Sequence, residues 1–418
     1  MTFPALLRPL RLPAVVPATL GLSLLLSSCE LPDQARQWFA NLSVSETPVD
    51  GRITVRRALT ADERGQVNAT PMVLRMPAQS SASTNDTARM LAGLPASGQD
   101  YYPQVRASQA WASHKARLDR LWTDFNWRHE APIRAWAASQ IGDLQSNTLF
   151  YPFSGPDYLF ANAFFPHADT LVLCGLESCD PLPPLAQMNP GEVTGSLGGL
   201  TSSLNTVMQF SFFITKDMRK DFVGTRLKGV LPPLLTFMAR SGDRIDSVDF
   251  VGIGANGQIG IVGPGNARGV LVRANGGTKR VFYFRQDLSD SGVHPGCPFF
   301  AFISSLGRPP AFVKSASYLM HEEGFHNIRN YLLHNCRGIV QDPSGVPYRN
   351  LLAAGDDVRL YGNYRGTLDM FKSHQQPDLI AAYERGQGQP VDFGIGYLYQ
   401  HNRTSLMVAR PGARISAR

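Results

Sequence analysis

The stretch "LFYPFSGPDYLFANAFFPHADTLVLCGLESC", residues 149–179, decides the fold. It contains two apolar runs, residues 149–153 and 170–176, separated by a Gly-Pro turn and by a passage that favours a short helix from Tyr158. Apolar runs of about four to eight residues bounded by glycine and proline are typical of buried strands. The stretch therefore predicts a strand–helix–strand unit.

The direction of the second strand decides what this unit can do. A right-handed crossover would make the two strands parallel and bring both carboxyl ends to one edge of a sheet. The connecting passage, residues 158–166, is short for such a crossover, which usually needs at least about ten residues. An antiparallel pair is therefore the open alternative, and it would place the two carboxyl ends at opposite edges.

The rest of the chain continues the alternation of helix and strand. Apolar residues recur at helical spacing across residues 101–145, and residues 190–203 are polar and glycine-rich, which predicts a loop. "GVLPPLLTFMARSGDRIDSVDFVGIG" predicts a helix that runs into a strand, "GVLVRANGGTKRVFYFRQDL" a hairpin, "PPAFVKSASYLMH" and "FHNIRNYLLHNC" helices, and "DVRLYGNYRG" a strand. This alternation favours an α/β fold: a mixed sheet flanked by helices, in a single large domain that spans residues 101–418.

The first hundred residues have a different composition. Arg8 and Arg11 precede an apolar run that ends in two serines, and these are the basic, apolar and small-residue regions of a secretory signal. The run is too short to span a bilayer, which takes about 20 apolar residues. Residues 29–100 are largely low-complexity, rich in Pro, Ser, Thr and Gly, and cannot readily bury a core. We expect a signal peptide over residues 1–28 and a tether over residues 29–100.

The residues "LSSC", Leu26 to Cys29, resemble the lipobox of bacterial lipoproteins. The resemblance implies cleavage before Cys29 and lipidation of that residue, with the membrane as a partner through the N-terminal lipid. Glu30 stands where an aspartate would resemble an inner-membrane retention signal, so the outer membrane, facing the periplasm, is the expected location. The alternative is an ordinary signal peptide cut nearby, which would leave Cys29 as a spare thiol.

Cysteine usage agrees with an exported chain. Without a lipidated Cys29, four of the five cysteines remain, an even number that permits two disulfides. We expect Cys174 to pair with Cys179, because "CGLESC" is short and turn-like, and Cys297 to pair with Cys336. The alternative is four buried free thiols.

The polar residues after the two apolar runs are the candidate site. Ser154 and Asp157 follow the first run and Glu177 follows the second, and ligand sites in open α/β sheets lie beyond the carboxyl ends of strands. If the strands are parallel, Asp157 and Glu177 face one crevice. A periplasmic hydrolase would use Ser154, Asp157, His167 or Glu177 as acid, base or nucleophile. The plainer interpretation is a turn at Gly-Pro, with Asp157 capping the helix that follows.

Two motifs that suggest cofactors fail on inspection. "GIGANG" has the glycine spacing of a dinucleotide-binding loop, but "QIGIVGPG" follows in place of a helix, so a hairpin turn at Asn256-Gly257 explains it better. "HEEGFH" places His321 and His326 five residues apart, where a shared helix face needs four, and Gly324 is expected to end the helix, with both histidines at the surface. We expect neither a cofactor nor a metal.

Charge and aromatic content narrow the partners. The formal charge of +7 falls to +5 when Arg8 and Arg11 are removed, and the basic clusters are interrupted by apolar residues, so no nucleic acid partner is expected. All five tryptophans lie within the first 136 residues. A helical aromatic stripe is more often core than a carbohydrate-stacking surface, which is the alternative.

Two tracts, "FYPFSGPDYLFANAFFPHADTLVLCGLES" and "IVQDPSGVPYRNLL...VRLYGNYRGTLDMF", resemble an uncharacterised family of exported bacterial proteins. The resemblance covers most of residues 140–400 and implies no activity. Taken together, the sequence favours a lipid-anchored envelope protein whose periplasmic α/β domain binds a ligand or a partner. The alternative is a periplasmic hydrolase with its site near Ser154, Asp157 and Glu177.

Overall fold

The computed structural model describes residues 81–211, 225–400 and 402–412. All of them belong to one compact unit that spans Ala69–Arg418. Cys29, the signal peptide and most of the expected tether lie outside the described residues. None of the described helices is both long enough and apolar enough to cross a bilayer.

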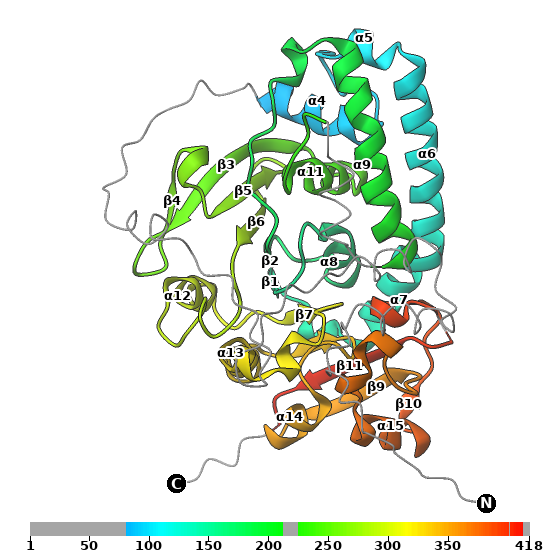
Figure 1. Ribbon diagram of the computed structural model, residues 1–418, viewed down its shortest axis with the longest axis vertical. Coiled ribbons are helices and arrows are strands. Elements are labelled where there is room, and N and C mark those ends of the chain that lie inside the picture. The colour runs from blue at the N-terminus through cyan, green and yellow to red at the C-terminus, as the bar shows by residue number, and fades with distance from the viewer. Residues whose placement is uncertain (1–80, 212–224, 401, 413–418) are drawn as a thin grey trace, which may run out of the picture. The chain divides into compact units, whose positions relative to one another are not determined.

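The described residues form a single mixed sheet with the strand order β10-β9-β11-β8-β7-β1-β2-β6-β5-β3-β4 (Figure 1). Five neighbouring strands at its centre, from β8 to β6, are parallel, and the outer strands are mostly antiparallel. The strands are β1 Thr148–Tyr151, β2 Thr170–Gly175, β3 Ile245–Ile253, β4 Ile259–Ile261, β5 Gly269–Ala274, β6 Lys279–Arg285, β7 Ala311–Val313, β8 Ile339–Gln341, β9 Asp357–Gly362, β10 Gly388–Gln389 and β11 Ser405–Arg410.

Helices flank this sheet, so the predicted α/β class with a mixed sheet is confirmed. The longer described helices are α4 Ser81–Leu91, α6 Gln109–Phe125, α7 Ala131–Gln140, α9 Pro190–Phe210, α11 Leu231–Arg240, α12 Pro298–Ser305, α13 His326–Asn335 and α15 Pro377–Glu384. The shorter ones are α5 Pro103–Arg106, α8 Tyr158–Phe164 and α14 Tyr348–Ala353. A π-helical segment, η3 Asn126–Glu130, joins α6 to α7, and 3-10 turns include η7 Leu319–His321, η8 Glu323–Phe325, η9 Asp369–His374 and η10 Gly396–Leu398.

The strand–helix–strand unit forms as predicted, and its two strands are parallel. Thr148 pairs with Thr170 and Tyr151 with Leu173, so the antiparallel alternative is wrong. Asp157 caps α8, because its Oδ1 accepts a hydrogen bond from the Phe160 backbone N–H at 3.1 Å. The connection suffices because the loops on both sides of α8 lengthen the crossover.

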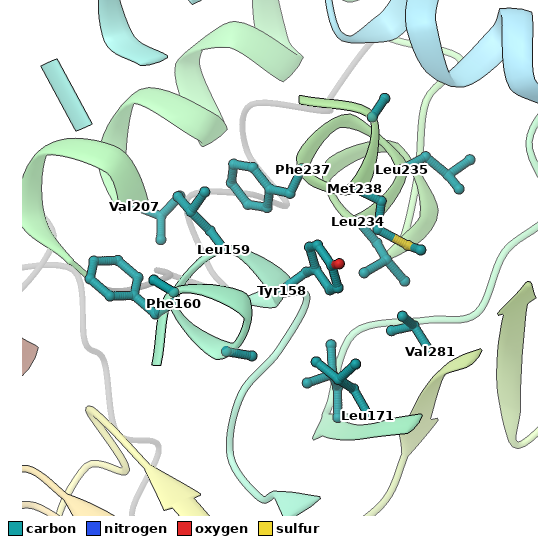
Figure 2. Close-up of a cluster of buried hydrophobic side chains, with 14 of the residues drawn as sticks. Tyr158, Leu159, Phe160, Leu171, Val207, Leu234, Leu235, Phe237, Met238 and Val281 are labelled. Carbon is teal, nitrogen blue, oxygen red and sulfur yellow. The ribbon is translucent and has the colours of Figure 1, made fainter. Parts of the chain in front are cut away.

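The two faces of the sheet bury different side chains, as the alternation of a strand requires. On one face, strand residues join a core built with α4, α6, α7, α8, α9 and α11. Figure 2 shows part of this core, where Leu171 and Val281 lie below Tyr158 of α8 and the apolar side chains of α11. On the other face Phe150 contacts Phe299 of α12 and Tyr331 of α13.

Two segments differ from the prediction. Residues 190–203 begin the long helix α9 instead of forming a loop, because the Asn189 side chain caps it, Pro190 starts it, and Val193, Leu197 and Leu200 form a buried stripe despite the glycines. The stretch "PPAFVKSASYLMH" contains the strand β7 in place of a helix. A strand of three residues is too short to show a period of two, so its surroundings alone decide its conformation.

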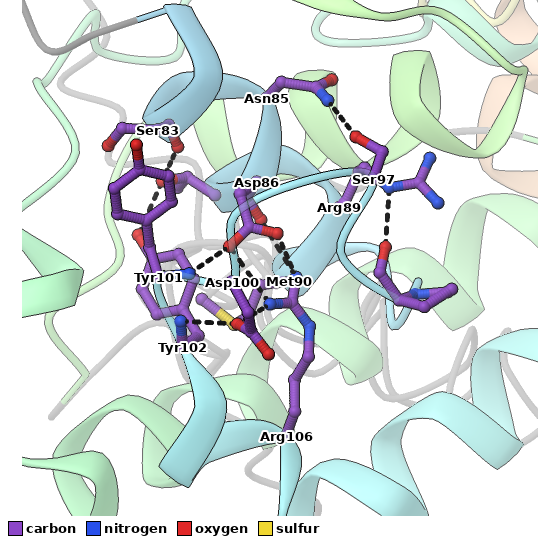
Figure 3. A network of polar contacts seen from close by, with 12 residues as sticks. Ser83, Asn85, Asp86, Arg89, Met90, Ser97, Asp100, Tyr101, Tyr102 and Arg106 are labelled. Atoms are coloured by element: carbon purple, nitrogen blue, oxygen red, sulfur yellow. Dashed lines mark hydrogen bonds and ion pairs between the residues drawn. The ribbon is translucent and has the colours of Figure 1, made fainter.

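The folded domain begins earlier than residue 101. In α4, within the expected tether, Met90 and Leu91 are fully buried. Figure 3 shows the polar network that fixes this helix, in which Asp86 accepts from the Tyr101 backbone N–H at 2.8 Å and pairs with Arg106 at 2.5 Å. The composition of residues 81–100 did not predict α4, because the apolar residues of this helix are few and are buried by other parts of the domain.

Candidate functional site

The carboxyl edge between β1 and β7 is a topological switch point. The chain leaves β1 through α8 to reach β2 on one side, whereas it leaves β7 through α13 to reach β8 on the other side. The two helices cover opposite faces of the sheet (Figure 1). In open α/β sheets, ligands bind outside the carboxyl ends of the strands at such a point. The residues that follow β1 and β7 are therefore the candidate site.

A buried ion pair occupies this point. Lys314, directly after β7, lies with its Nζ 2.9 Å from Oδ2 of Asp157, and both side chains are no more than 2% exposed. Oδ2 of Asp157 also accepts a hydrogen bond from the Tyr151 hydroxyl at 2.9 Å. The Lys314 ammonium donates to the Ser211 carbonyl and lies 4.1 Å from the centre of the Phe160 ring. Every polar group of the pair is thus held in place.

A second carboxylate, Asp342, follows β8 and joins the loops at this edge. It accepts hydrogen bonds from the backbone N–H groups of Ser315 and Ser344, both at 3.0 Å, and from the Ser344 hydroxyl at 2.5 Å. The Ser344 hydroxyl in turn accepts from the Ala316 backbone N–H at 2.8 Å. A Cβ atom on Gly396 would lie 1.9 Å from Oδ2 of Asp342, so only glycine fits there. Asp342 therefore joins the loops after β7 and β8 to the C-terminal part of the domain.

Burial governs the protonation of these groups. Desolvation lowers the pKa of the Lys314 amine, and the negative charges of Asp157 and Asp342 oppose that shift. Desolvation likewise raises the pKa of Asp342, against the hydrogen bonds from Ser344 and Ser315 and the charge of Lys314. Perturbed titration of this kind, with specific charge partners at a sheet edge, is typical of functional sites.

Backbone strain gathers at the same place. Six described non-glycine residues have positive φ, and all but Asn275, in the β5–β6 hairpin, flank this edge: Phe153, Ser211, Ser315, Ser317 and Tyr318. Each such conformation costs of order 1–3 kcal/mol and persists only where the surrounding structure enforces it. Three of them lie in the loop directly after β7, which marks that loop as a constrained element of the site.

Aromatic rings and two histidines enclose the strained loop. Tyr318 stacks on His374 and contacts His321, with ring centroids 5.5 and 5.0 Å apart. Nε2 of His321 and the Ser315 hydroxyl are buried without a hydrogen-bond partner in the part of the chain that the structure describes, although the backbone of Pro343 and Gly345 lies beside the histidine ring. Burial, with a smaller contribution from His374, lowers the pKa of His321 to about 4, so its ring is neutral at pH 7.

Ser154 reaches the predicted edge, but its hydroxyl is committed to the backbone. It accepts from the Cys174 backbone N–H at 2.9 Å, and its single hydrogen can be donated to the carbonyl oxygen of either Gly155 or Cys174, at 2.9 and 3.1 Å. These bonds join the loop after β1 to the end of β2. This geometry gives the hydroxyl of Ser154 a role in positioning the loop.

Glu177 lies at the same edge as Asp157 but has other partners. Its carboxylate accepts from the Tyr283 hydroxyl of β6 at 2.8 Å and packs against Gly155. Asp157 faces Lys314 after β7, on the opposite side of the β1–β2 pair. The expectation that both carboxylates lie at one edge is correct. They contact different residues, however, because Glu177 bonds to Tyr283 and Asp157 pairs with Lys314.

His167 cannot join Ser154. It is exposed and lies three residues before β2, at the amino end of that strand, whereas Ser154 lies at the carboxyl edge. A strand of six residues spans roughly 20 Å, so His167 lies far from Ser154. Among the described residues no group of three or more His, Cys, Asp or Glu is placed to hold a metal.

The two rejected motifs behave largely as interpreted. In "GIGANG" the Gly257 backbone N–H donates to the Gly254 carbonyl at 2.9 Å inside the β3–β4 hairpin. In "HEEGFH" a new helix, α13, begins at His326, which is exposed and lies 3.2 Å from Asp290. His321 is the exception, because it is largely buried instead of lying at the surface.

The structure holds Cys174, Cys179, Cys297 and Cys336 as free, buried thiols, so neither expected disulfide is present in it. Burial raises the pKa of Cys174, and it raises the pKa of Cys179 and Cys336 to about 12. Each expected pair does share a neighbourhood: the first pair lies near Tyr283 and the second near Tyr331. The pairing stays a prediction about the oxidised protein.

Sequence reasoning missed Lys314, Asp342 and His321. One signal was present, because Lys314 and Asp342 each follow a short apolar run, "AFV" and "IVQ", as Asp157 follows "LFY". The runs were too short to be recognised as strands, so the charges after them were not recognised as edge residues.

No known protein family matches this chain, and neither a curated protein nor a solved structure is detectably similar to it.

Proposed function

We propose that the chain is a lipoprotein of the bacterial envelope, anchored through Cys29, whose α/β domain binds a small polar ligand at the carboxyl edge between β1 and β7. The observation that carries the ligand site is the buried Asp157–Lys314 pair at the topological switch point. The strained loop after β7 and the two unpartnered polar atoms beside it support the same edge. The hydrolase alternative loses support, because the hydroxyl of Ser154 is bonded to the backbone.

The unpartnered atoms suggest how the ligand is held. A buried polar group without a hydrogen bond costs about 1–3 kcal/mol, and a ligand that supplies the missing bond recovers that cost. Ser315 offers a hydroxyl, and neutral His321 offers either a donor or an acceptor. Both side chains suit a ligand that carries hydroxyl, amide or carboxylate groups.

The first test removes these two atoms together. The variant Ser315→Ala/His321→Gln is expected to stay folded, because neither the Ser315 hydroxyl nor Nε2 of His321 has a hydrogen-bond partner among the described residues. It is expected to lose the small molecule that co-purifies with the wild type. Native mass spectrometry of the detergent-extracted, full-length protein measures the bound mass. The matched control is Ser289→Ala/His326→Gln, which changes the same residue types at a half-buried and an exposed position whose side chains hydrogen-bond to Ser291 and Asp290. An equal bound mass in both variants, or a wild type with none, would contradict the proposal.

The second test concerns the anchor. Replacing Cys29 by Ala is expected to abolish labelling by a clickable palmitate analogue in a Gram-negative host, since the acceptor thiol and the future N-terminus are both lost. Replacing Cys336 by Ala serves as the control and should leave the label unchanged, because that thiol is buried. Label retained by the Cys29 variant would show that the lipid is attached elsewhere.

A further inference from the structure

A solvent-exposed tryptophan stands at the junction of α6 and α7. Trp127 is 76% exposed, whereas Trp111 and Trp136 are 7% and 8% exposed and belong to the core. It lies in the π-helical segment Asn126–Glu130, whose wider turn keeps Phe125 and His129 buried against Phe160 and leaves Trp127 facing solvent. Single-turn π segments occur often at functional sites.

The ring borders a shallow hollow on one face of the helix. The lining residues form two adjacent rows at four-residue spacing, Asp119/Thr123/Trp127 and Arg120/Asp124, which places them on one helix face over about two turns. The hollow measures about 450 Å³, within the ~300–1,000 Å³ typical of small-molecule sites. Its lining consists of Asp119, Arg120, Thr123, Asp124 and Trp127.

The polar groups of the hollow include paired carboxylates and an arginine. Asp124 is held by Arg128 at 2.7 Å, and Asp119 is held by Arg240, also at 2.7 Å. Carboxylates fixed in this way still present free oxygen lone pairs, and the exposed Arg120 beside them supplies N–H donors. Adjacent acceptors and donors match a hydroxyl group, which does both.

We propose that this hollow binds a neutral hexopyranose unit of an oligosaccharide, with the C–H face of the sugar ring on Trp127. A flat apolar ring complements the apolar face of a pyranose, and the flanking Asp124 and Arg120 take up the hydroxyl groups at its rim. A carbohydrate-stacking surface is the alternative role that the sequence leaves open for the tryptophans, and we assign that role to Trp127 alone. This site is independent of the ligand edge at β1 and β7.

The surroundings disfavour other occupants. A bilayer would have to accept the charges of Asp119, Arg120 and Asp124 next to the ring, which is costly. A stable protein interface buries about 1,200–2,000 Å² around an apolar centre. Here the exposed apolar surface is a single side chain, because none of the other highly exposed large apolar side chains among the described residues lines this hollow.

The test titrates the full-length protein in detergent with three probes, maltopentaose, cellopentaose and chitopentaose, by isothermal calorimetry. At least one is expected to bind, and Trp127→Ala is expected to weaken that binding at least tenfold, Trp127→Phe less. The control Leu352→Ala removes another exposed apolar side chain (47% exposed) and should bind as the wild type does.

Three results would overturn the proposal: no binding of any probe by the wild type, equal binding by the Trp127→Ala variant, or Trp127-dependent binding to phosphatidylglycerol vesicles in place of the sugars. A folded Trp127→Ala variant is expected because the side chain makes little contact with the core, and its circular dichroism spectrum verifies this.

Discussion

Replacing Lys314 by Met is expected to lower the free energy of unfolding by about 3–5 kcal/mol, because the change leaves the Asp157 carboxylate buried without its cation. The pair is no more than 2% exposed, so water cannot solvate the charge that remains. Urea denaturation of the variant against the wild type measures the difference. Lys115→Met is the control: its pair with Asp119 is about 40% exposed on both sides, and its loss should cost at most about 1 kcal/mol.

The double variant Asp157→Asn/Lys314→Met separates charge from packing. The introduced asparagine would be neutral: its oxygen would accept from the Phe160 backbone N–H, and its amide N–H would donate to the Tyr151 hydroxyl oxygen. The double variant is therefore expected to be more stable than Lys314→Met alone. The two changes would then be strongly non-additive, as expected for residues in direct contact. A double variant as unstable as the sum of the singles would show that the ion pair is not the reason for the loss.

Lowering the pH from 7 to 5 is expected to reduce the free energy of unfolding by roughly 4 kcal/mol through two buried histidines. Burial lowers the pKa of both His114 and His129 to about 4, from an ordinary value of 6.5. In this window the unfolded chain binds a proton at each histidine and the folded chain does not, so stability falls as the pH falls. Each histidine contributes roughly 2 kcal/mol at pH 5, and His321 acts in the same direction.

The structural reason lies in the hydrogen bonds of the neutral rings. Nε2 of His114 donates to the Leu91 carbonyl at 2.8 Å, and Nδ1 of His129 donates to the Gly394 carbonyl at 3.2 Å. Urea denaturation at half-unit pH steps between 7 and 4.5 gives the slope of the free energy of unfolding against pH, which counts the protons taken up on unfolding. In the His114→Gln variant this number should be lower by about one. A stability that is flat across this range would refute the buried neutral histidines.

Both predictions depend on contacts that no local pattern contains. The turn at Gly155-Pro156, the Asp157 cap and the two apolar runs are adjacent in the chain, so β1, α8, β2 and their carboxyl edge could be predicted from residues 149–179. Lys314 and Asp342 are separated from Asp157 by more than 150 residues and follow strands of three residues each. Their convergence depends on the order in which β7, β8 and β1 are placed in the sheet.

Composition and periodicity thus determined the α/β class, the mixed sheet and the edge that carries the polar loops, because each of these follows from burying apolar runs next to one another in the chain. Only the tertiary structure decided which charges meet at that edge, that α4 belongs to the core, and that Trp127 is left in solvent. Those outcomes depend on strand order and on one π-helical turn. Neither feature produces a recognisable sequence pattern, because each is stabilised by residues distant in the sequence.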